Sequence, residues 1–187
     1  MRQPAPTTNE TVRALRQAFD QSFARALQPA NLQLLEVLVV RIGGDGYAIR
    51  LADIQGLYAD RRVVPVPSPL TDLLGVTGFR GQVVPVYDLG ALLGKTRRGA
   101  LRWMVLVQTR GRDLRALAFD TFEAYAAVTA DRLVAVDDPA LASDITARPF
   151  VHGAVRIEQT VRPILQVQSI VDLLQQRVDA ARSNKER

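Results

Sequence analysis

Hydrophobic residues near the start of the chain recur at intervals of three and four positions. This spacing places them on one face of an α-helix, and Thr7-Thr8-Asn9-Glu10 has the form of a capping box at its start. The helix is predicted to end before Pro29, because proline cannot continue it. Its apolar stripe is expected either to cover the chain's own β domain or to bind a partner or a second copy. The stripe consists of Val12, Leu15, Phe19, Phe23 and Leu27.

From residue 34 the pattern changes to short apolar runs separated by turn residues, which is typical of β-strands. A hairpin is predicted where strand 35–42 is followed by a Gly-Gly-Asp-Gly turn and a return strand that starts at Tyr47. A second hairpin is predicted from the apolar runs at 103–108 and 114–119. The other predicted elements are a short helix at 51–57, an extended segment at 63–69, a turn around 78–81, a strand at 82–87 with Asp88 capping a short helix, a strand within 128–136, and a strand pair at 150–157 and 162–167.

Two stretches of the chain share one order of elements. Residues 83–93 and 164–174 each combine a strand with a short helix that ends in a Leu-Leu pair. This echo indicates two similar β lobes, and the many short strands predict a mainly β fold of small barrels or a sandwich. The expected organisation is an N-terminal extension at 1–35, a β domain at 36–174 with its first lobe at roughly 45–95, and a polar tail at 175–187.

The charge of the chain changes this picture little. A formal net charge of +5 and a sequence pI of 10.2 point at first to nucleic-acid binding. Residues 36–171 hold sixteen basic and fourteen acidic side chains, however, so the predicted β domain is close to neutral. The short basic groups lie beside predicted turns, where a solvated surface is the simpler interpretation. These groups are Arg61-Arg62, Arg97-Arg98, and Arg110 with Arg112 and Arg115.

Residue types that catalysis and metal binding need are scarce in this sequence. It has no cysteine and a single histidine, His152, so a nucleophile–histidine arrangement has little to draw on. Asp137, Asp138 and Asp144 could bind a hard cation weakly, but Asp-Asp-Pro is also a common turn. We therefore expect no enzymatic activity, no cofactor and no metal. The absence of a signal-peptide pattern and of a long apolar run predicts a cytoplasmic protein.

The segment Gly78-Phe79-Arg80-Gly81 matches the GxxG loop of nucleic-acid-binding KH domains. A KH loop joins two helices, whereas this one leads directly into an apolar, strand-like run. Aromatic residues that could stack on bases make up only 6% of the chain. A β-barrel module that binds nucleic acid through this loop stays open as an alternative function.

Residues 51–93 as a whole resemble the CheW family, the adaptors that couple chemoreceptors to their histidine kinase in bacterial and archaeal chemosensory arrays. The resemblance rests above all on GVTGFRGQVVPVYDL at 75–89, which is similar to the family signature Gly-Val-x-Asn-Leu-Arg-Gly-x-x-x-Pro-Val-x-Asp-Leu. Tyr47-Ala48-Ile49, Ile54-Gln55 and Val64-Pro65 lie in matching positions on its N-terminal side. The hairpin at 103–119 and the strand and helix at 162–174 extend the resemblance to roughly 36–174.

The resemblance implies two small SH3-like, five-stranded β barrels with a short C-terminal helix, and the predicted N-terminal amphipathic helix precedes this domain. It also implies a non-enzymatic adaptor whose partners are the regulatory domain of a CheA-type histidine kinase and the cytoplasmic tip of a chemoreceptor. Self-association through the N-terminal helix is a further expectation. The residues that the resemblance places at or beside protein contacts are Arg80, Ile54, Gly56, Gly75, Val76 and Phe79.

Two departures from the family pattern bear on these contacts. Gly56 stands where the family commonly has glutamate, and Gly78 stands where it has asparagine. Loss of a carboxylate removes a charge-assisted contact, so a divergent member that binds one partner and acts as a decoy is an alternative. Two roles are also open for Arg80: contact with a partner, or hydrogen bonds to carbonyl groups that hold the glycine-rich turn.

Overall fold

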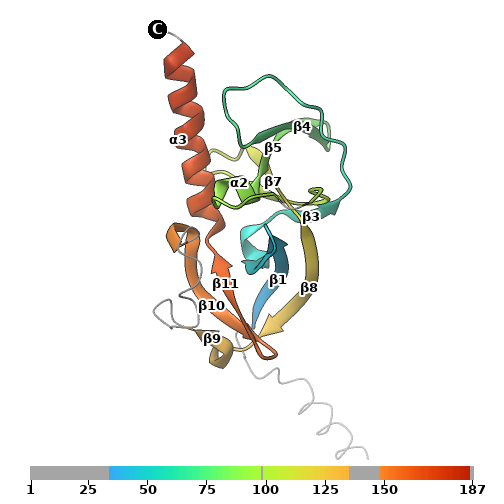
Figure 1. The fold of residues 1–187 in the computed structure, drawn as a ribbon, viewed down its shortest axis with the longest axis vertical. Helices are drawn as coiled ribbons and strands as arrows, with labels where there is room; N and C mark the ends of the chain where they lie inside the picture. Colours follow the sequence, from blue (N-terminus) through green and yellow to red (C-terminus); the bar gives the residue numbers. More distant parts are fainter. Residues whose placement is uncertain (1–33, 98, 135–147, 186–187) are drawn as a thin grey trace, which may run out of the picture. The chain divides into compact units, whose positions relative to one another are not determined.

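The computed structural model describes residues 34–97, 99–134 and 148–185 of the 187-residue chain. The predicted N-terminal helix and the three aspartates of the possible cation site lie outside these residues. The described part consists mainly of β-strands that form two sheets, with one long helix, α3 (Val167–Lys185), beside them (Figure 1). The expectation of a mainly β, SH3-like fold with two lobes is confirmed.

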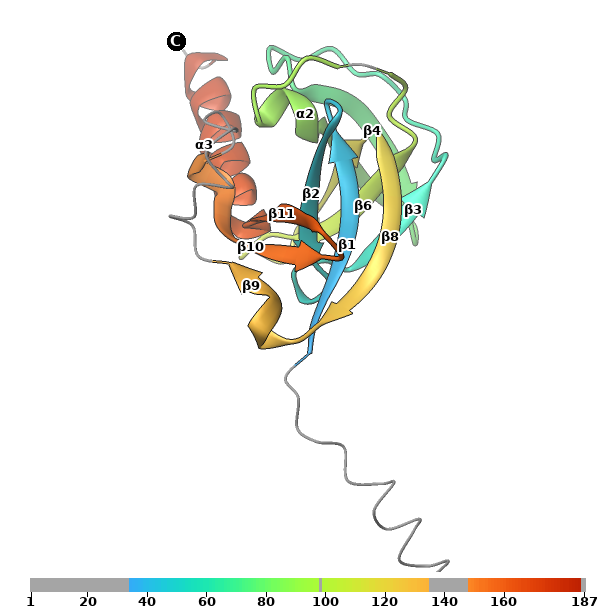
Figure 2. The ribbon, with the colours of Figure 1, turned by 60° about the horizontal axis from the view of Figure 1, so that its bottom comes forward.

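The first sheet has six strands in the order β8-β1-β2-β11-β10-β9 (Figure 2). The predicted hairpin of β1 and β2 is present, and Gly43 and Gly44 take positive φ values of 62° and 93° at its turn. The predicted pair of β10 and β11 is also present, and β11 runs parallel to β2. The strand bounds are β1 Leu35–Ile42, β2 Asp45–Arg50, β8 Thr121–Val128, β9 Leu133–Val134, β10 Val151–Ile157 and β11 Thr160–Leu165.

The second sheet has five strands in the order β3-β6-β7-β5-β4. Its centre is the predicted β6–β7 hairpin, and β5 runs parallel to β7. At the end of β5, the Asp88 side chain accepts a hydrogen bond of 3.1 Å from the backbone N–H of Ala91 and so caps α2 (Leu89–Leu92). The strand bounds are β3 Gly56–Ala59, β4 Leu73–Phe79, β5 Gln82–Asp88, β6 Trp103–Gln108 and β7 Leu114–Phe119.

The two sheets repeat one spatial arrangement of strands, which accounts for the echo in the sequence. In each sheet the second strand of a hairpin pairs in parallel with a strand that leads into a helix: β2 with β11 before α3, and β7 with β5 before α2. The five-stranded sheet is built from residues 56–119, whereas the sequence placed the first lobe at roughly 45–95. The bounds differ because β2 pairs with β1 in the other sheet, and because β6 and β7 complete the five-stranded one.

Buried apolar residues form one large cluster and two smaller ones. The large cluster draws on β1 and β2 of the first sheet, β6 and β7 of the second, and α3; Val40, Leu117 and Leu174 are examples, each with 0% exposure. Each sheet adds a small cluster of its own, one around Val86 and one around Val155. The lobes therefore share a core and are stabilised together.

Several elements differ from the prediction. Only Leu51–Asp53 of the short helix expected at 51–57 is helical, as a single 3₁₀ turn, and β3 follows it. The prediction of a strand within 128–136 was largely wrong, since the strand is β8 at 121–128 and only β9 lies further on. The turn expected around 78–81 is narrower, because β4 continues through Phe79. The helix expected to end near 174 continues to Lys185.

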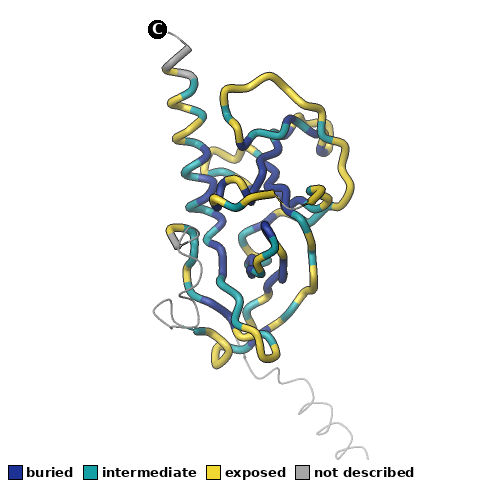
Figure 3. Tube along the Cα trace, viewed as in Figure 1, coloured by how far each residue is buried: buried dark blue, intermediate teal, exposed yellow. Residues whose placement is uncertain are grey.

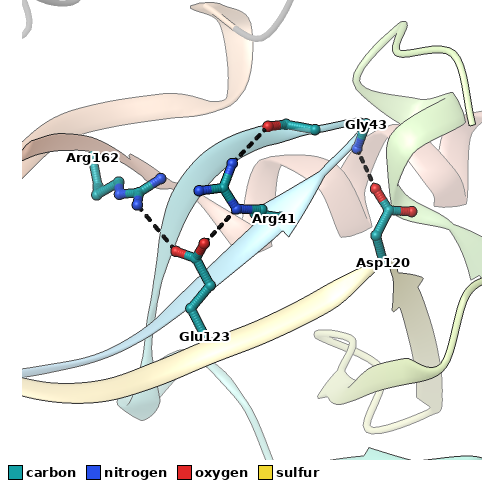
Figure 4. A network of polar contacts seen from close by, with 6 residues as sticks. Arg41, Gly43, Asp120, Glu123 and Arg162 are labelled. Atoms are coloured by element: carbon teal, nitrogen blue, oxygen red, sulfur yellow. Dashed lines mark hydrogen bonds and ion pairs between the residues drawn. The ribbon is translucent and has the colours of Figure 1, made fainter. Parts of the chain in front are cut away.

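Strand β8 is held to its sheet by polar contacts as well as by its backbone pairing with β1 (Figure 4). Glu123 on β8 lies between Arg41 of β1 and Arg162 of β11, and its carboxylate accepts from both; the Arg162 contact measures 3.0 Å. Asp120, just before β8, accepts a hydrogen bond of 2.6 Å from the backbone N–H of Gly43. These contacts join residues far apart in sequence, so the local pattern of apolar residues could not predict them.

Helix α3 leaves the first sheet and packs along the second. Where burial along it is described, the buried residues lie in its first half, which is dark blue in Figure 3; they are Val167, Ile170, Val171 and Leu174. Polar contacts then tie it to the second sheet: Gln175 accepts a hydrogen bond of 2.6 Å from Arg115 on β7, and Arg177 pairs at 3.1 Å with Asp72, just before β4. The Asp72 side chain is only 3% exposed, so this pair is partly withdrawn from water.

Loss of the Arg177–Asp72 pair is expected to destabilise the fold. The substitution Arg177→Leu leaves the buried Asp72 carboxylate without its cation, and we expect it to lower the free energy of unfolding by about 1–3 kcal/mol in urea denaturation. Arg110→Leu is the control, because the Arg110–Asp172 pair on the same helix is exposed at both ends and should contribute at most about 1 kcal/mol. If both variants lose the same free energy of unfolding, the partly buried Arg177–Asp72 pair stabilises the fold no more than the exposed pair does.

Candidate functional site

The β4–β5 hairpin carries the signature segment and presents its arginine at the tip. Phe79 pairs with Gln82, so Arg80 and Gly81 form a two-residue loop, and both take positive φ values, 45° and 78°. Tight hairpin turns need this backbone conformation, which glycine adopts freely and arginine adopts at a cost. The Arg80 side chain is exposed and makes no hydrogen bond or ion pair with any described residue. It therefore does not hold the turn.

The other candidate residues lie mostly beneath the surface. Phe79 is 4% exposed and packs edge-on against Tyr58, with ring centroids 4.7 Å apart. Ile54 is 9% exposed and belongs to the large shared cluster. Gly56 is half-buried at the start of β3, and a Cβ added there would approach the Tyr58 ring to 3.0 Å. These residues shape the sheet under the hairpin, while Arg80 is the candidate whose side chain is fully presented.

The extended segment at 63–69 packs against Gly75 and Val76 of β4. Val76 exchanges two backbone hydrogen bonds with Val64, of 2.8 and 2.9 Å. Gly75 has a φ of +147°, and a Cβ at this position would lie 2.2 Å from the Val64 carbonyl oxygen. The glycine therefore allows the two backbones to approach closely, and the half-buried Val76 side chain faces the adjoining hollow.

Three hollows surround this hairpin. The first, of about 390 Å³, is lined by Arg61, Arg62, Val64, Val76 and Val83 among others. The second, of about 220 Å³, lies between Tyr58, Phe79 and Arg80. The third, of about 440 Å³, lies between Val83 and Arg112. We call the surface over these hollows the hairpin face; its exposed or half-exposed side chains include Arg61, Arg62, Val64, Val76, Arg80, Val83, Arg112 and Asp113.

The centre of the hairpin face is apolar. Val83 is 75% exposed and borders two of the hollows, and Val64 is 50% exposed beside it. The sequence names Val64 only as part of the family resemblance, and neither residue is predicted from it as a contact. Strand alternation could have done so, because Val84 and Val86 point into the core and Val83 therefore points out. Arg62, predicted to lie on a solvated surface, is exposed and lies beside this apolar centre.

The described residues offer little for catalysis. No group of three or more His, Asp or Glu side chains within them could hold a metal ion. His152 lies exposed on β10, in the sheet that does not carry the hairpin face. No helix among these residues is long and apolar enough to cross a membrane. The arrangement around the hairpin, with an apolar centre and charged surroundings, is suited to protein contact.

Comparison with known proteins gives the same class of molecule. Residues 36–175 match the CheW-like domain family. A probable chemotaxis protein CheW from Rhizobium etli is 24% identical over 146 residues, which cover 78% of this chain and 92% of that protein. The chemotaxis protein CheW of Rhizobium meliloti is 25% identical over 136 residues, which cover 72% and 86%.

A solved structure shows the same fold. The scaffolding protein TtCheW from Thermoanaerobacter tengcongensis aligns with a TM-score of 0.62 and 18% identity, over 74% of this chain and 92% of that one. Because the family match covers most of the described residues, the chain belongs to the CheW-like domain family. Its class is therefore that of the chemotaxis scaffold and adaptor proteins.

Gly75 is expected to be needed for folding. Gly75→Ala combines an unfavourable φ with a clash against the Val64 carbonyl, so we expect it to lower the free energy of unfolding by about 1–3 kcal/mol. Gly78→Ala on the same strand is the control, because no atom lies within 4 Å of the added Cβ, and its effect should stay within about 0.5 kcal/mol. Thermal unfolding monitored by circular dichroism measures both. A stable Gly75→Ala variant would contradict the close approach described above.

Proposed function

We propose that this protein is a chemosensory adaptor that couples chemoreceptors of the methyl-accepting type to a CheA-type histidine kinase. The observation that carries the proposal is the hairpin face, an exposed apolar centre with an unpaired arginine at its tip, on a chain of the CheW-like family. On this proposal the protein has no catalytic step of its own and acts in the cytoplasm, in arrays with the receptors.

Such an adaptor acts through binding free energy alone. It holds a kinase regulatory domain and a receptor tip at a defined separation, and both lobes share one core, so their contact surfaces keep a fixed relation. The adaptor changes kinase activity only if it binds the active and inactive arrangements with different affinities, since equal affinity for both shifts nothing. A rigid hairpin face suits this role, because a rigid surface loses little conformational entropy when it binds.

We assign different roles to the six candidate residues. Arg80 contacts a partner directly, because its side chain is exposed and makes no hydrogen bond or ion pair with a described residue. Val76 contributes apolar surface beside Val64. The remaining four act from below by shaping the sheet that carries the hairpin; they are Ile54, Gly56, Gly75 and Phe79.

The test is an isothermal titration of the full chain against the regulatory domain of a CheA-type kinase and, separately, a receptor cytoplasmic-tip fragment, both from the same organism. We expect micromolar affinity for each partner. Arg80→Glu should weaken at least one of them about tenfold or more, because it reverses a charge at the contact. Arg80→Asn is the matched variant, since asparagine tolerates the positive φ and removes the charge without reversing it.

Three results would change this assignment. Binding of one partner and not the other would indicate a decoy. Binding of neither by the wild-type chain would end the adaptor proposal. Equal affinities for wild type and Arg80→Glu, with unchanged thermal unfolding, would keep the adaptor but remove Arg80 from its contacts.

A further inference from the structure

Arginines are divided unevenly over the described surface. Eight of them form an ion pair with a carboxylate: Arg41, Arg50, Arg97, Arg102, Arg110, Arg132, Arg162 and Arg177. Six other arginines have described side chains and form no ion pair. Five of them line the three hollows around the β4–β5 hairpin, and the sixth is Arg156 on β10. Four of the five are exposed: Arg61, Arg62, Arg80 and Arg112. The hairpin face thus collects the unpaired positive charge.

The carboxylate next to Arg61 in the sequence does not neutralise this charge. Asp60, which directly precedes Arg61, is held by Arg102 through two hydrogen bonds of 2.9 and 2.8 Å. The hydrogen bond from Arg102 lowers the pKa of Asp60 below its usual value, so this carboxylate is ionised and already paired. Asp113 is the one carboxylate among the residues that line the three hollows. The face keeps a net positive charge.

Three of the four exposed arginines lie around the apolar centre, and Arg80 lines the second hollow. Arg61 and Arg62 line the first hollow with Val64, Arg112 lines the third, and Val83 lies between the two. Arg61 also lies over the rings of Tyr58 and Phe79, 5.3 and 5.0 Å from their centroids, so its guanidinium keeps a fixed place without a carboxylate. Charges placed around an apolar centre act at the rim of an interface, where they select the partner and raise the association rate.

We propose that the hairpin face selects a partner protein whose own surface has carboxylates around an apolar patch. This inference rests on the proposed function. It adds the sign of the charge on the partner's surface and names the arginines that would contact that charge. Arg61, Arg62 and Arg112 lie outside the signature segment at 75–89. They therefore add a preference for an acidic partner to whatever contact the signature arginine, Arg80, makes.

A protein fits this face better than a nucleic acid or a lipid surface does. Single-stranded nucleic acid is bound largely through aromatic rings that are free to stack, but Phe79 is buried and Tyr58 packs against Phe79 beneath Arg61. An anionic membrane would be drawn to a broad positive field, whereas residues 36–171 are nearly neutral as a whole. The exposed Val83 and Val64 need an apolar counterpart, which a folded partner supplies.

The experiment compares single charge reversals in the full chain. The variants are Arg62→Glu and Arg112→Glu, whose side chains make no hydrogen bond or ion pair with a described residue, and the matched control is Arg156→Glu. Arg156 is also an exposed, unpaired arginine, so its reversal changes the net charge by the same amount. It lies on β10 of the other sheet, away from the hairpin face. Affinities for the kinase regulatory domain and the receptor tip are measured at low and at physiological salt.

We expect Arg62→Glu and Arg112→Glu each to weaken one of these partners about three- to tenfold at low salt, and Arg156→Glu to leave both affinities unchanged. The difference between wild type and variant should shrink as salt rises, because exposed charges are screened. Thermal unfolding of all three variants should match wild type.

The possible failures are distinguishable. If the wild type binds its partners and all three variants bind as tightly, the acidic-partner inference is wrong while the adaptor proposal stands. If neither partner binds the wild type, both fall together. Duplex DNA and phosphatidylserine vesicles are titrated in parallel. Tighter binding to either of these, lost in Arg62→Glu but not in Arg156→Glu, would overturn the choice of a protein partner.

Discussion

The large apolar cluster between the two sheets and α3 is the interaction on which the rest of this structure depends. A small sheet has only one face with which to bury apolar side chains, and neither sheet here closes a large core by itself. Val40, Leu117 and Leu174 come from β1, β7 and α3, and together they remove from water surface that no single lobe could cover. Because the chain passes from the first sheet through the whole of the second and back again, the lobes cannot separate without opening this cluster. That linkage gives the hairpin face a rigid support.

At the hairpin, the packing of buried residues leaves two valine side chains exposed to solvent. Gly75 lets the 63–69 segment approach β4, and Val64 is then paired by its backbone while half of its side chain stays in solvent. Val83 is exposed because its neighbours Val84 and Val86 must point inward, and a strand cannot turn consecutive side chains to the same face. The apolar centre is therefore a consequence of the way the sheet is built. What makes it selective is the set of arginines that find no carboxylate within the described part of the chain.

The signature segment predicted more about the backbone than about the contacts. Its glycines and arginine correctly indicated a turn followed by a strand, although the loop is only Arg80 and Gly81. Of the six candidate residues, Ile54, Gly75 and Phe79 are buried, because a motif marks positions that the fold needs together with positions that a partner touches. Strand alternation marks Val83 as facing outward, but only the placement of the strands shows that Tyr58, Val64 and Val83 line the hollows.

The sequence by itself determined the elements whose signals are local. Glycine-rich turns marked the β1–β2 hairpin, Asp88 marked the start of α2, and the repeated strand-and-helix pattern marked the two lobes. Tertiary structure decided the rest. Strand β8 mixes strand-favouring residues such as Phe122 and Tyr125 with three alanines, so its local signal is ambiguous, and its place is fixed by pairing with β1 and by the contacts of Glu123 with Arg41 and Arg162. Which arginines lack a carboxylate partner was decided in the same way, because an ion pair depends on side chains that meet in space and can be far apart in the chain.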